Sequence, residues 1–181
     1  MRNRLLLSLS CLALLAGCSK PKKTAGSAEK KPVRQIDACS LLTSGEIETL
    51  QGEALKETIP SAPGGDLYTV AQCYFTLPNN VNSIVLTVTQ RGKGPTAKDP
   101  REYWEQTFGE KGEKHEPGEE GEKRRPPLKV EGLGDEAFWL ANAVGGALYV
   151  LKDNMYLRVS TGGTDELERS KRIAQTVLPK L

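Results

Sequence analysis

Cysteine and histidine are the residue types of this chain that most readily do chemistry, and both are scarce. The 181 residues contain four cysteines, Cys11, Cys18, Cys39 and Cys73, and one histidine, His115. Nucleophilic catalysis by serine or cysteine needs a base held beside the nucleophile. The single histidine lies in a run of glycine, glutamate and lysine, and the chain has no G-x-S-x-G, C-x-x-C or P-loop sequence. We therefore expect a protein that is not an enzyme and uses no cofactor.

His115 is also the natural starting point for a metal site, since Glu116 and Glu119 follow it closely. Zinc sites of the H-E-x-x-H type place two histidines one turn apart on a helix. Pro117-Gly118 interrupts such a helix, and the second histidine is missing. Residues 109–127 carry no large apolar side chain, so we expect them to form a disordered, charged loop without a metal.

Adjacent acids offer the remaining chemical possibility. Asp135 and Glu136 lie close to Trp139, after Gly132-Leu133-Gly134, which matches only a fragment of a G-x-G-x-x-G motif. Adjacency in the sequence specifies no catalytic geometry for two carboxylates, and paired glycines are typical of a turn. An enzyme with an acid site at this place is thus the least favoured function.

The N-terminus has the three parts of a secretory signal peptide. Arg2 and Arg4 are a positive start, Leu5 to Leu15 are mostly apolar, and Ala16-Gly17 are small residues suited to cleavage. A helix of that apolar length rises about 16 Å, roughly half the hydrocarbon core of a bilayer. The segment therefore predicts export rather than a membrane span.

Leu15-Ala16-Gly17-Cys18 resembles the lipobox of bacterial lipoproteins, L-[AS]-[GA]-C. The resemblance implies cleavage after residue 17 and attachment of a diacylglyceryl group to the Cys18 sulfur, after which the new amino group can be acylated. Two or three acyl chains hold a protein durably at a membrane, since each buried methylene contributes about 0.8 kcal/mol. The alternative is an ordinary signal peptide that happens to contain a cysteine. Ser19 favours an outer membrane where one exists, because some inner-membrane lipoproteins carry aspartate there.

Charge is unevenly distributed along the mature chain. Loss of residues 1–17 removes Arg2 and Arg4, so the net charge of +2 becomes 0. Residues 18–35 carry six basic residues against Glu29, a net charge of +5, which leaves −5 for residues 36–181. We expect a disordered basic tether, either drawn toward anionic headgroups or simply solvated. The acidic remainder, read as a single domain, argues against nucleic-acid binding.

Cys39 and Cys73 remain once Cys11 leaves with the signal peptide and Cys18 is lipidated. An even number of cysteines in an exported chain indicates one disulfide. Two free buried thiols are the alternative.

Three helices are expected. Thr43 and Glu46 form a capping box before a short helix that ends near Gly52. Residues 99–108 begin with an Asp-Pro cap and place Trp104 and Phe108 on one face, which we interpret as core rather than the wall of a ligand pocket. Residues 164–181 have an apolar stripe formed by Leu167, Ala174, Val177 and Leu178, with Ile173 beside it.

Strands are expected between these helices. Residues 67–77 and 84–89 are rich in aromatic and β-branched residues and predict an antiparallel hairpin. Residues 137–140 predict a further strand. Residues 148–151 and 155–159 predict a second hairpin, because Asp153-Asn154 tolerates the positive φ of a tight turn. The order of elements predicts an α+β fold, an antiparallel sheet with about three helices packed against it.

The same residues resemble a broad family of bacterial lipoproteins of unknown function. Its members open with D-x-C-x-L-L-[TS]-x-x-E-[VI] and carry a second cysteine in C-x-[YF]. The matching positions are Asp37, Cys39, Leu41, Leu42, Thr43, Glu46 and Ile47, then Cys73 and Phe75. The family is similar to α/β sandwiches of the PsbP type, which implies an antiparallel sheet between helices. The loop at 109–127 departs from the family's short connection.

These features predict a lipid-anchored, non-catalytic module on the exported side of the cell envelope. Its partners would be the membrane, through the anchor, and a ligand or an envelope protein. The alternative is a carrier of a small apolar ligand held between the sheet and the Trp104/Phe108 helix. A cavity of several hundred Å³ behind that helix would favour the carrier.

Overall fold

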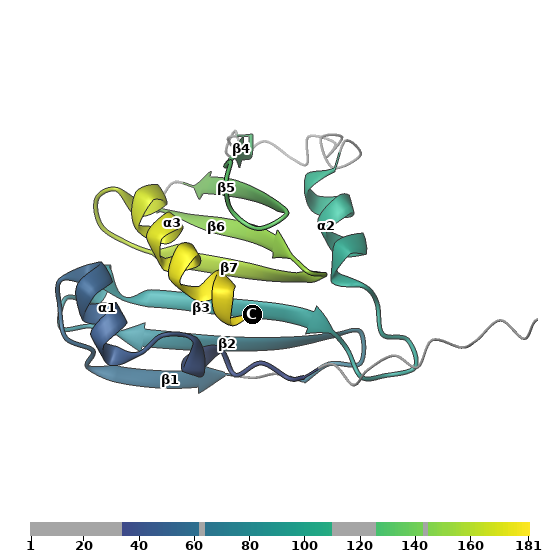
Figure 1. Cartoon of the computed structure of the whole chain (residues 1–181), viewed down its shortest axis with the longest axis horizontal. Helices are drawn as coiled ribbons and strands as arrows, with labels where there is room; N and C mark the ends of the chain where they lie inside the picture. Colours follow the sequence, from purple (N-terminus) through teal and green to yellow (C-terminus); the bar gives the residue numbers. More distant parts are fainter. Residues whose placement is uncertain (1–33, 62–63, 110–125, 143–144) are drawn as a thin grey trace, which may run out of the picture. The chain divides into compact units, whose positions relative to one another are not determined.

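The computed structural model describes residues 34–61, 64–109, 126–142 and 145–181. These residues form an α+β fold with one seven-stranded, fully antiparallel sheet in the order β1-β2-β3-β7-β6-β5-β4 (Figure 1). The predicted signal peptide, Cys18 and almost all of the tether lie outside the described residues, as do residues 110–125 of the predicted loop.

Along the chain, runs of strands are separated by single α-helices. The strands are β1 (Glu57–Ser61), β2 (Tyr68–Thr76), β3 (Ile84–Arg91), β4 (Leu128–Lys129), β5 (Glu136–Asn142), β6 (Gly145–Lys152) and β7 (Met155–Thr161). The α-helices are α1 (Ser44–Gln51), α2 (Pro100–Phe108) and α3 (Glu166–Val177). Short 3₁₀ turns are η1 (Ala38–Leu41), η2 (Asn80–Asn82) and η4 (Leu178–Lys180).

Two antiparallel meanders meet in the middle of the sheet. β1-β2-β3 and β4-β5-β6-β7 are each built from neighbours in the sequence, and β3 pairs with β7 to join them. Both predicted hairpins are confirmed, and Asp153 and Asn154 have φ values of 47° and 63° in the β6–β7 turn. The edge strands β1 and β4 were not predicted, because β1 is almost entirely exposed and contains Pro60, while β4 has two residues.

Alternation along the strands creates two faces of different character. We call the closed face the one that carries Leu86 and Val88 of β3, Leu157 of β7 and Leu148 of β6. The cavity face carries the alternate residues, which in β3 and β7 are mostly only partly buried. Successive side chains of a strand point to opposite sides, so the two faces share no residue.

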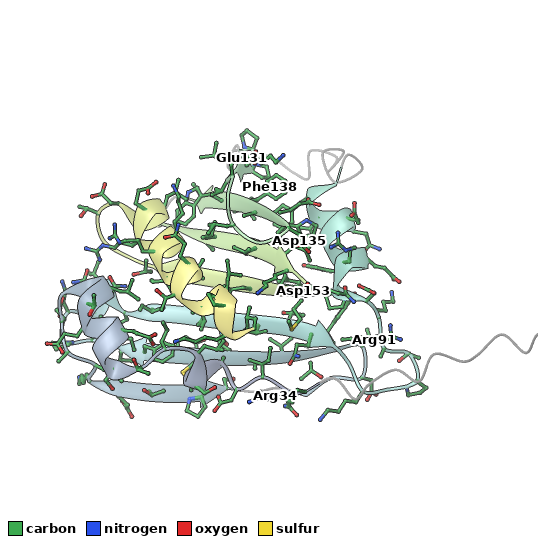
Figure 2. All side chains as sticks on the ribbon, in the orientation of Figure 1. Arg34, Arg91, Glu131, Asp135, Phe138 and Asp153 are labelled. Atoms are coloured by element: carbon green, nitrogen blue, oxygen red, sulfur yellow. A yellow bond between two sulfur atoms is a disulfide. The ribbon has the colours of Figure 1, made fainter. Side chains whose placement is uncertain are left out.

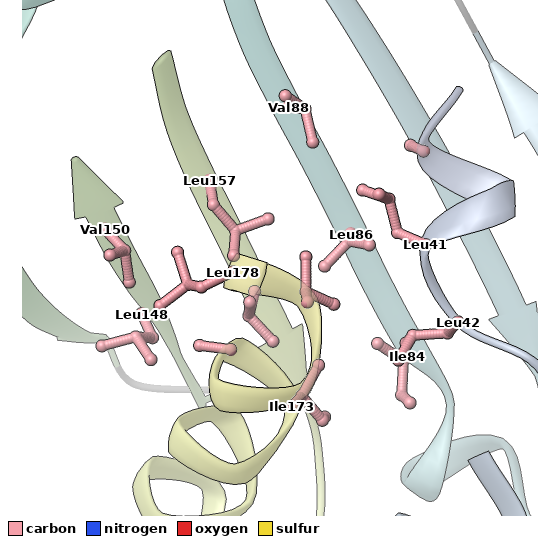
Figure 3. Close-up of a cluster of buried hydrophobic side chains, with 14 of the residues drawn as sticks. Leu41, Leu42, Ile84, Leu86, Val88, Leu148, Val150, Leu157, Ile173 and Leu178 are labelled. Atoms are coloured by element: carbon pink, nitrogen blue, oxygen red, sulfur yellow. The ribbon is translucent and has the colours of Figure 1, made fainter. Parts of the chain in front are cut away.

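The closed face is covered by α1, η1 and α3 (Figure 1). Ile173 of α3 and Leu178 of η4 pack with the strand residues of the closed face. Leu41 and Leu42 cover β3 on the same face, beside α3 (Figure 3). The predicted stripe of the last helix is confirmed at Ala174, Val177 and Leu178, whereas Leu167 lies at the margin of the core. Removal of this apolar surface from water is the main stabilisation of the fold.

The predicted capping box is present at the start of α1. The Thr43 amide donates to Glu46 Oε2 at 2.8 Å, and the Glu46 amide donates to Thr43 Oγ1 at 3.3 Å. Lys180 Nζ lies 2.7 Å from Glu46 Oε1 and so connects η4 to this cap. These contacts hold the pKa of Glu46 at about 2, chiefly through the Lys180 ammonium and the Thr43 amide.

The predicted disulfide between Cys39 and Cys73 is confirmed, with a Cα–Cα distance of 5.1 Å. It attaches η1 to the centre of β2, on the closed face. The alternative of two free thiols is therefore wrong.

Candidate functional site

Helix α2 is the element that distinguishes the cavity face. The side chain of Asp99 caps it by accepting from the Arg101 amide at 2.9 Å, and Pro100 occupies the first turn, as predicted. Two further contacts hold its N-terminus against the sheet. Arg101 Nη2 lies 3.1 Å from Asp135 Oδ2, and Asn154 Oδ1 accepts from the Arg101 amide at 3.1 Å. α2 is thereby fixed at one end to the β6–β7 turn.

Asp135 completes this attachment. Its Oδ2 accepts from the Asp153 amide at 3.2 Å, so one carboxylate joins α2 to the turn of the hairpin (Figure 2). Glu136, the second adjacent acid, instead accepts from Trp104 Nε1 at 3.1 Å. The two carboxylates thus hold α2 in place through different partners and do not form an acid pair. Gly132 and Gly134 have φ values of 79° and 56°, which confirms the predicted turn.

Aromatic side chains connect α2 to β5, β6 and β7. The ring centroids of Trp104 and Phe138 are 5.9 Å apart, and Phe108 stacks on Phe138 at 4.9 Å. Tyr103 stacks on Tyr156 at 5.8 Å. Such offset and tilted pairs are favourable beyond their buried area. This network orients α2 without covering the sheet completely.

A cavity of about 270 Å³ lies between α2 and the sheet, partly open to solvent. Its apolar and aromatic walls come from α2 and four strands: Val70, Tyr103, Trp104, Phe108, Leu140, Tyr149 and Tyr156. We call this space the aromatic cavity. The interpretation of Trp104 as core is confirmed, since it is 1% exposed. Trp104 and Phe108 also line a pocket, however, which is the alternative that the sequence left open.

The remaining lining side chains of the aromatic cavity are polar. They are Thr87 and Thr89 of β3, Thr107 of α2 and Arg158 of β7. Arg158 Nε donates to the Tyr149 hydroxyl at 3.2 Å. Its guanidinium carbon is 5.9 Å from the Tyr149 ring centroid, the outer limit of a cation–π contact, so the hydrogen bond positions it. Arg158 thus places one positive charge among described lining residues that are otherwise neutral.

Two hydroxyls of the cavity differ in their surroundings. Burial raises the pKa of the Tyr156 phenol, and a hydrogen bond with Thr89 opposes part of that shift. The Thr87 hydroxyl is buried and has no hydrogen-bond partner among the described residues. An unpartnered buried hydroxyl costs about 1–3 kcal/mol, which makes it an exception that needs a reason.

The described lining suits binding, since it combines apolar and aromatic walls with a few placed polar groups. Among the described residues, the lining includes no carboxylate, imidazole or thiol, the groups that most often act as acids, bases or nucleophiles. Within the described ranges, no group of three or more metal-ligating side chains converges anywhere. No described helix has both the length and the apolar character to cross a bilayer.

The structure places the predicted site residues in separate locations. His115, Glu116 and Glu119 fall in the part of the chain that is not described. Trp139 lies on the closed face, over Gly146, whereas Trp104 of α2 lies over the cavity face. Thr87 and Arg158 were missed, because an alternating strand pattern assigns such residues to solvent. One sequence signal could have indicated the cavity face: the alternate positions of β6 and β7 that an amphipathic pattern assigns to solvent include the aromatic residues Tyr149 and Tyr156.

Comparison with protein-family models, with curated proteins and with solved structures finds no significant match for this chain. The resemblance to bacterial lipoproteins and to PsbP-type sandwiches therefore stays a prediction, and the site is judged on its own geometry.

Proposed function

We propose that this protein is a lipid-anchored, non-catalytic module of the cell envelope that binds a small ligand in the aromatic cavity. The observation that carries the binding part is the cavity itself, about 270 Å³ between α2 and the sheet. Small-molecule sites are typically concave and largely apolar, with a few placed polar groups. The aromatic cavity has this composition.

Packing supports the same function. Protein interiors are usually filled to crystal-like density, and voids are destabilising. The closed face of this sheet follows that rule, since the core residues of β3, β6 and β7 on that side are fully buried. The cavity face does not, although α2 is tied down at its N-terminus and by stacked rings. A helix held in place over an incompletely filled space suits a preformed binding site.

The anchoring part rests on Leu15-Ala16-Gly17-Cys18 and on the export signal before it. Acyl chains on Cys18 would hold the protein at the membrane, and the basic tether would let the folded part work at a short distance from the lipid. The D-x-C-x-L-L-T-x-x-E pattern around Cys39, with C-x-F at Cys73, supports membership of the lipoprotein family of PsbP-like fold. A carrier that releases its ligand to a partner is the second candidate, and it uses the same cavity.

Anchoring is tested by the change Cys18→Ser followed by cell fractionation. We expect the wild-type protein to stay with membranes through salt and carbonate washes, and the variant to be lost from them. The matched control is Cys11→Ser, which lies within the apolar part of the signal peptide. Retention of Cys18→Ser in washed membranes would contradict the proposed anchor.

Ligand binding is tested with 5-fluorotryptophan, because the chain has two tryptophans that lie on opposite faces. The full-chain lipoprotein is placed in phosphatidylcholine nanodiscs and titrated with the neutral probe N-phenyl-1-naphthylamine. We expect the ¹⁹F resonance of Trp104 to shift and that of Trp139 to stay in place, with Trp139→Phe supplying the assignment. A titration that moves neither resonance would refute the cavity as a binding site.

A further inference from the structure

The polar groups of the aromatic cavity indicate which class of ligand it takes. We infer that the ligand is a small organic anion with a flat apolar body, whose anionic group is bound by the Arg158 guanidinium and the Thr87 hydroxyl. This inference rests on the proposed function and adds the charge and shape of the ligand.

Arg158 lies near the middle of the sheet on a central strand. Its cross-strand neighbours are Thr87 of β3 on one side and Tyr149 of β6 on the other. The side chain is half-buried, and Nε donates to the Tyr149 hydroxyl at 3.2 Å. A guanidinium has five N–H donors in a planar fork, so four remain for other partners. No described acid lies within ion-pair distance of them.

Other arginines of the fold show what a structural role looks like here. Arg101 is paired with Asp135 at 3.1 Å and holds the end of α2. Arg169 Nη1 donates to Gln51 Oε1 and Asn82 Oδ1 and joins α3 to α1 and η2. Arg158 has one phenol as its partner and faces the cavity. A partly desolvated cation without an opposite charge is unfavourable, and a bound anion would relieve this.

Thr87 supplies the second, independent observation. Its hydroxyl is buried without a partner among the described residues, and the side chain lines the same cavity as Arg158. Directly opposed residues of an antiparallel pair have Cβ atoms about 4.5–5.5 Å apart. One anionic group can therefore contact both side chains, once rotation about χ1 of Thr87 turns toward the cavity the hydroxyl that is closed off from it in this structure. The other unpartnered buried hydroxyl of the described chain, Ser170, belongs to α3 on the closed face.

The remaining walls define the rest of the ligand. Among the described residues, the lining contains one cation and no carboxylate, whereas residues 36–181 as a whole carry a net charge of −5. An isolated positive charge within an acidic protein favours an anion locally. Around it, Trp104, Phe108, Tyr149 and Tyr156 offer ring faces and edges, which suit a flat apolar body.

The experiment compares two probes of one skeleton in the ¹⁹F titration described above. The anion 8-anilinonaphthalene-1-sulfonate carries a sulfonate that N-phenyl-1-naphthylamine lacks. We expect Arg158→Gln to weaken binding of the anion about tenfold, because hydrogen bonds to charged groups are strong. Binding of the neutral probe should change less than about twofold, since the apolar walls are intact. Arg172→Gln, an exposed arginine of α3, removes the same charge and should alter neither titration.

Thr87→Val is the second variant, and it removes the hydroxyl while keeping the shape. We expect weaker binding of the anion, unchanged binding of the neutral probe, and a higher Tm of the unliganded protein, because an unpartnered polar group is lost. An unmoved Trp139 resonance verifies that each variant is folded. Decanoate, an anion with a flexible chain, is titrated in parallel. If decanoate binds more tightly than the aromatic anion, the inference that the ligand has a flat body is wrong.

The outcomes separate this inference from the function on which it rests. If both probes shift Trp104 but Arg158→Gln leaves the affinity for the anion within about twofold of wild type, the anionic ligand is refuted and the binding module stands. If neither probe shifts Trp104 in the wild-type protein, the proposed function fails first.

Discussion

The two faces of this sheet use the same strands and reach different results. On the closed face, Leu86, Leu148 and Leu157 are fully buried beneath α3 and η1. On the cavity face, the neighbouring residues Thr87, Tyr149 and Arg158 are partly buried and line an open space. Because side chains alternate along a strand, each β-strand contributes to both environments at once. One face is specialised for stability, which leaves the other able to tolerate a cavity and an unpaired charge.

The means of attachment differ in the same way. The closed face is secured by a disulfide, a capped helix and a continuous apolar core. The cavity face has α2 alone, held by one ion pair, one hydrogen bond to the β6–β7 turn, one to Glu136 of β5, and stacked rings. We therefore expect perturbations of the closed face to unfold the protein and perturbations of the cavity face to change binding.

Removal of the disulfide is the strongest test of this division. Replacing both Cys39 and Cys73 by alanine should lower the free energy of unfolding by about 3–4 kcal/mol, given the loop that the bond closes. The measurement is denaturant unfolding of the oxidised wild type against the double variant. Where the variant is still folded, binding of the neutral naphthylamine probe should persist, because the bond lies on the closed face. Loss of probe binding in a variant that is still folded would show that the two faces are coupled.

The same substitution on each face gives a matched comparison. Leu157→Ala, in the closed core, should lower the free energy of unfolding by about 3 kcal/mol, because it leaves a void that the core cannot fill. Leu140→Ala, at the wall of the aromatic cavity, should lower it by about 1 kcal/mol, since that side chain is only partly buried. Urea midpoints at constant m-value provide the measurement. Equal losses for the two variants would contradict the difference between the faces.

Acid should act on the closed face through Glu46. Its pKa is about 2 in the folded protein, against 4.5 for an unperturbed glutamate. A lowered folded-state pKa means that the contribution is complete above pH 4.5 and disappears as the pH falls toward 2. After allowance for solvent screening this amounts to about 1 kcal/mol. Glu46→Gln should reduce the dependence of the free energy of unfolding on pH across that range. Glu48→Gln on the same helix, away from Lys180, should leave this pH dependence as in wild type.

Alkali should act on the cavity face through Tyr156. Burial raises the pKa of this phenol, so the folded state resists its ionisation. A raised folded-state pKa gives a contribution that is present below the unfolded pKa and is lost as the pH rises past the folded one. Stability should therefore fall above about pH 10. Tyr156→Phe should reduce this loss while changing the unfolding midpoint little at pH 8, and an unaltered alkaline slope would refute the assignment.

Signals in the sequence were sufficient to predict the start of a helix, a tight turn and the disulfide. Thr43 and Glu46 predicted the start of α1 because a capping box needs only four consecutive residues. Asp153-Asn154 predicted the β6–β7 turn because both residues tolerate positive φ. The Cys39–Cys73 pair followed from the count of cysteines that remain beyond the predicted signal peptide and lipid anchor. Each of these features depends on neighbouring residues or on composition.

The aromatic cavity depends on contacts between distant segments. From the sequence, a pocket at this helix was predicted only as the alternative to a filled core. The sequence predicted Trp104 as a core residue, and only the packing of α2 on the sheet shows that this buried side chain also lines a cavity. β1 was not foreseen, since an exposed edge strand containing Pro60 has no apolar alternation. Thr87 and Arg158 carry no motif, and only the pairing of β3 with β7 puts them side by side.

The sequence by itself therefore determined the helix caps, the hairpins and the antiparallel α+β class, because these arise from interactions short in sequence. Tertiary structure alone decided the order of strands, the closing of one face and the placement of an unpaired guanidinium beside an unpartnered hydroxyl on the other. Register and helix packing are properties of the whole sheet, and no local pattern in the chain specifies which alternate residues meet α2.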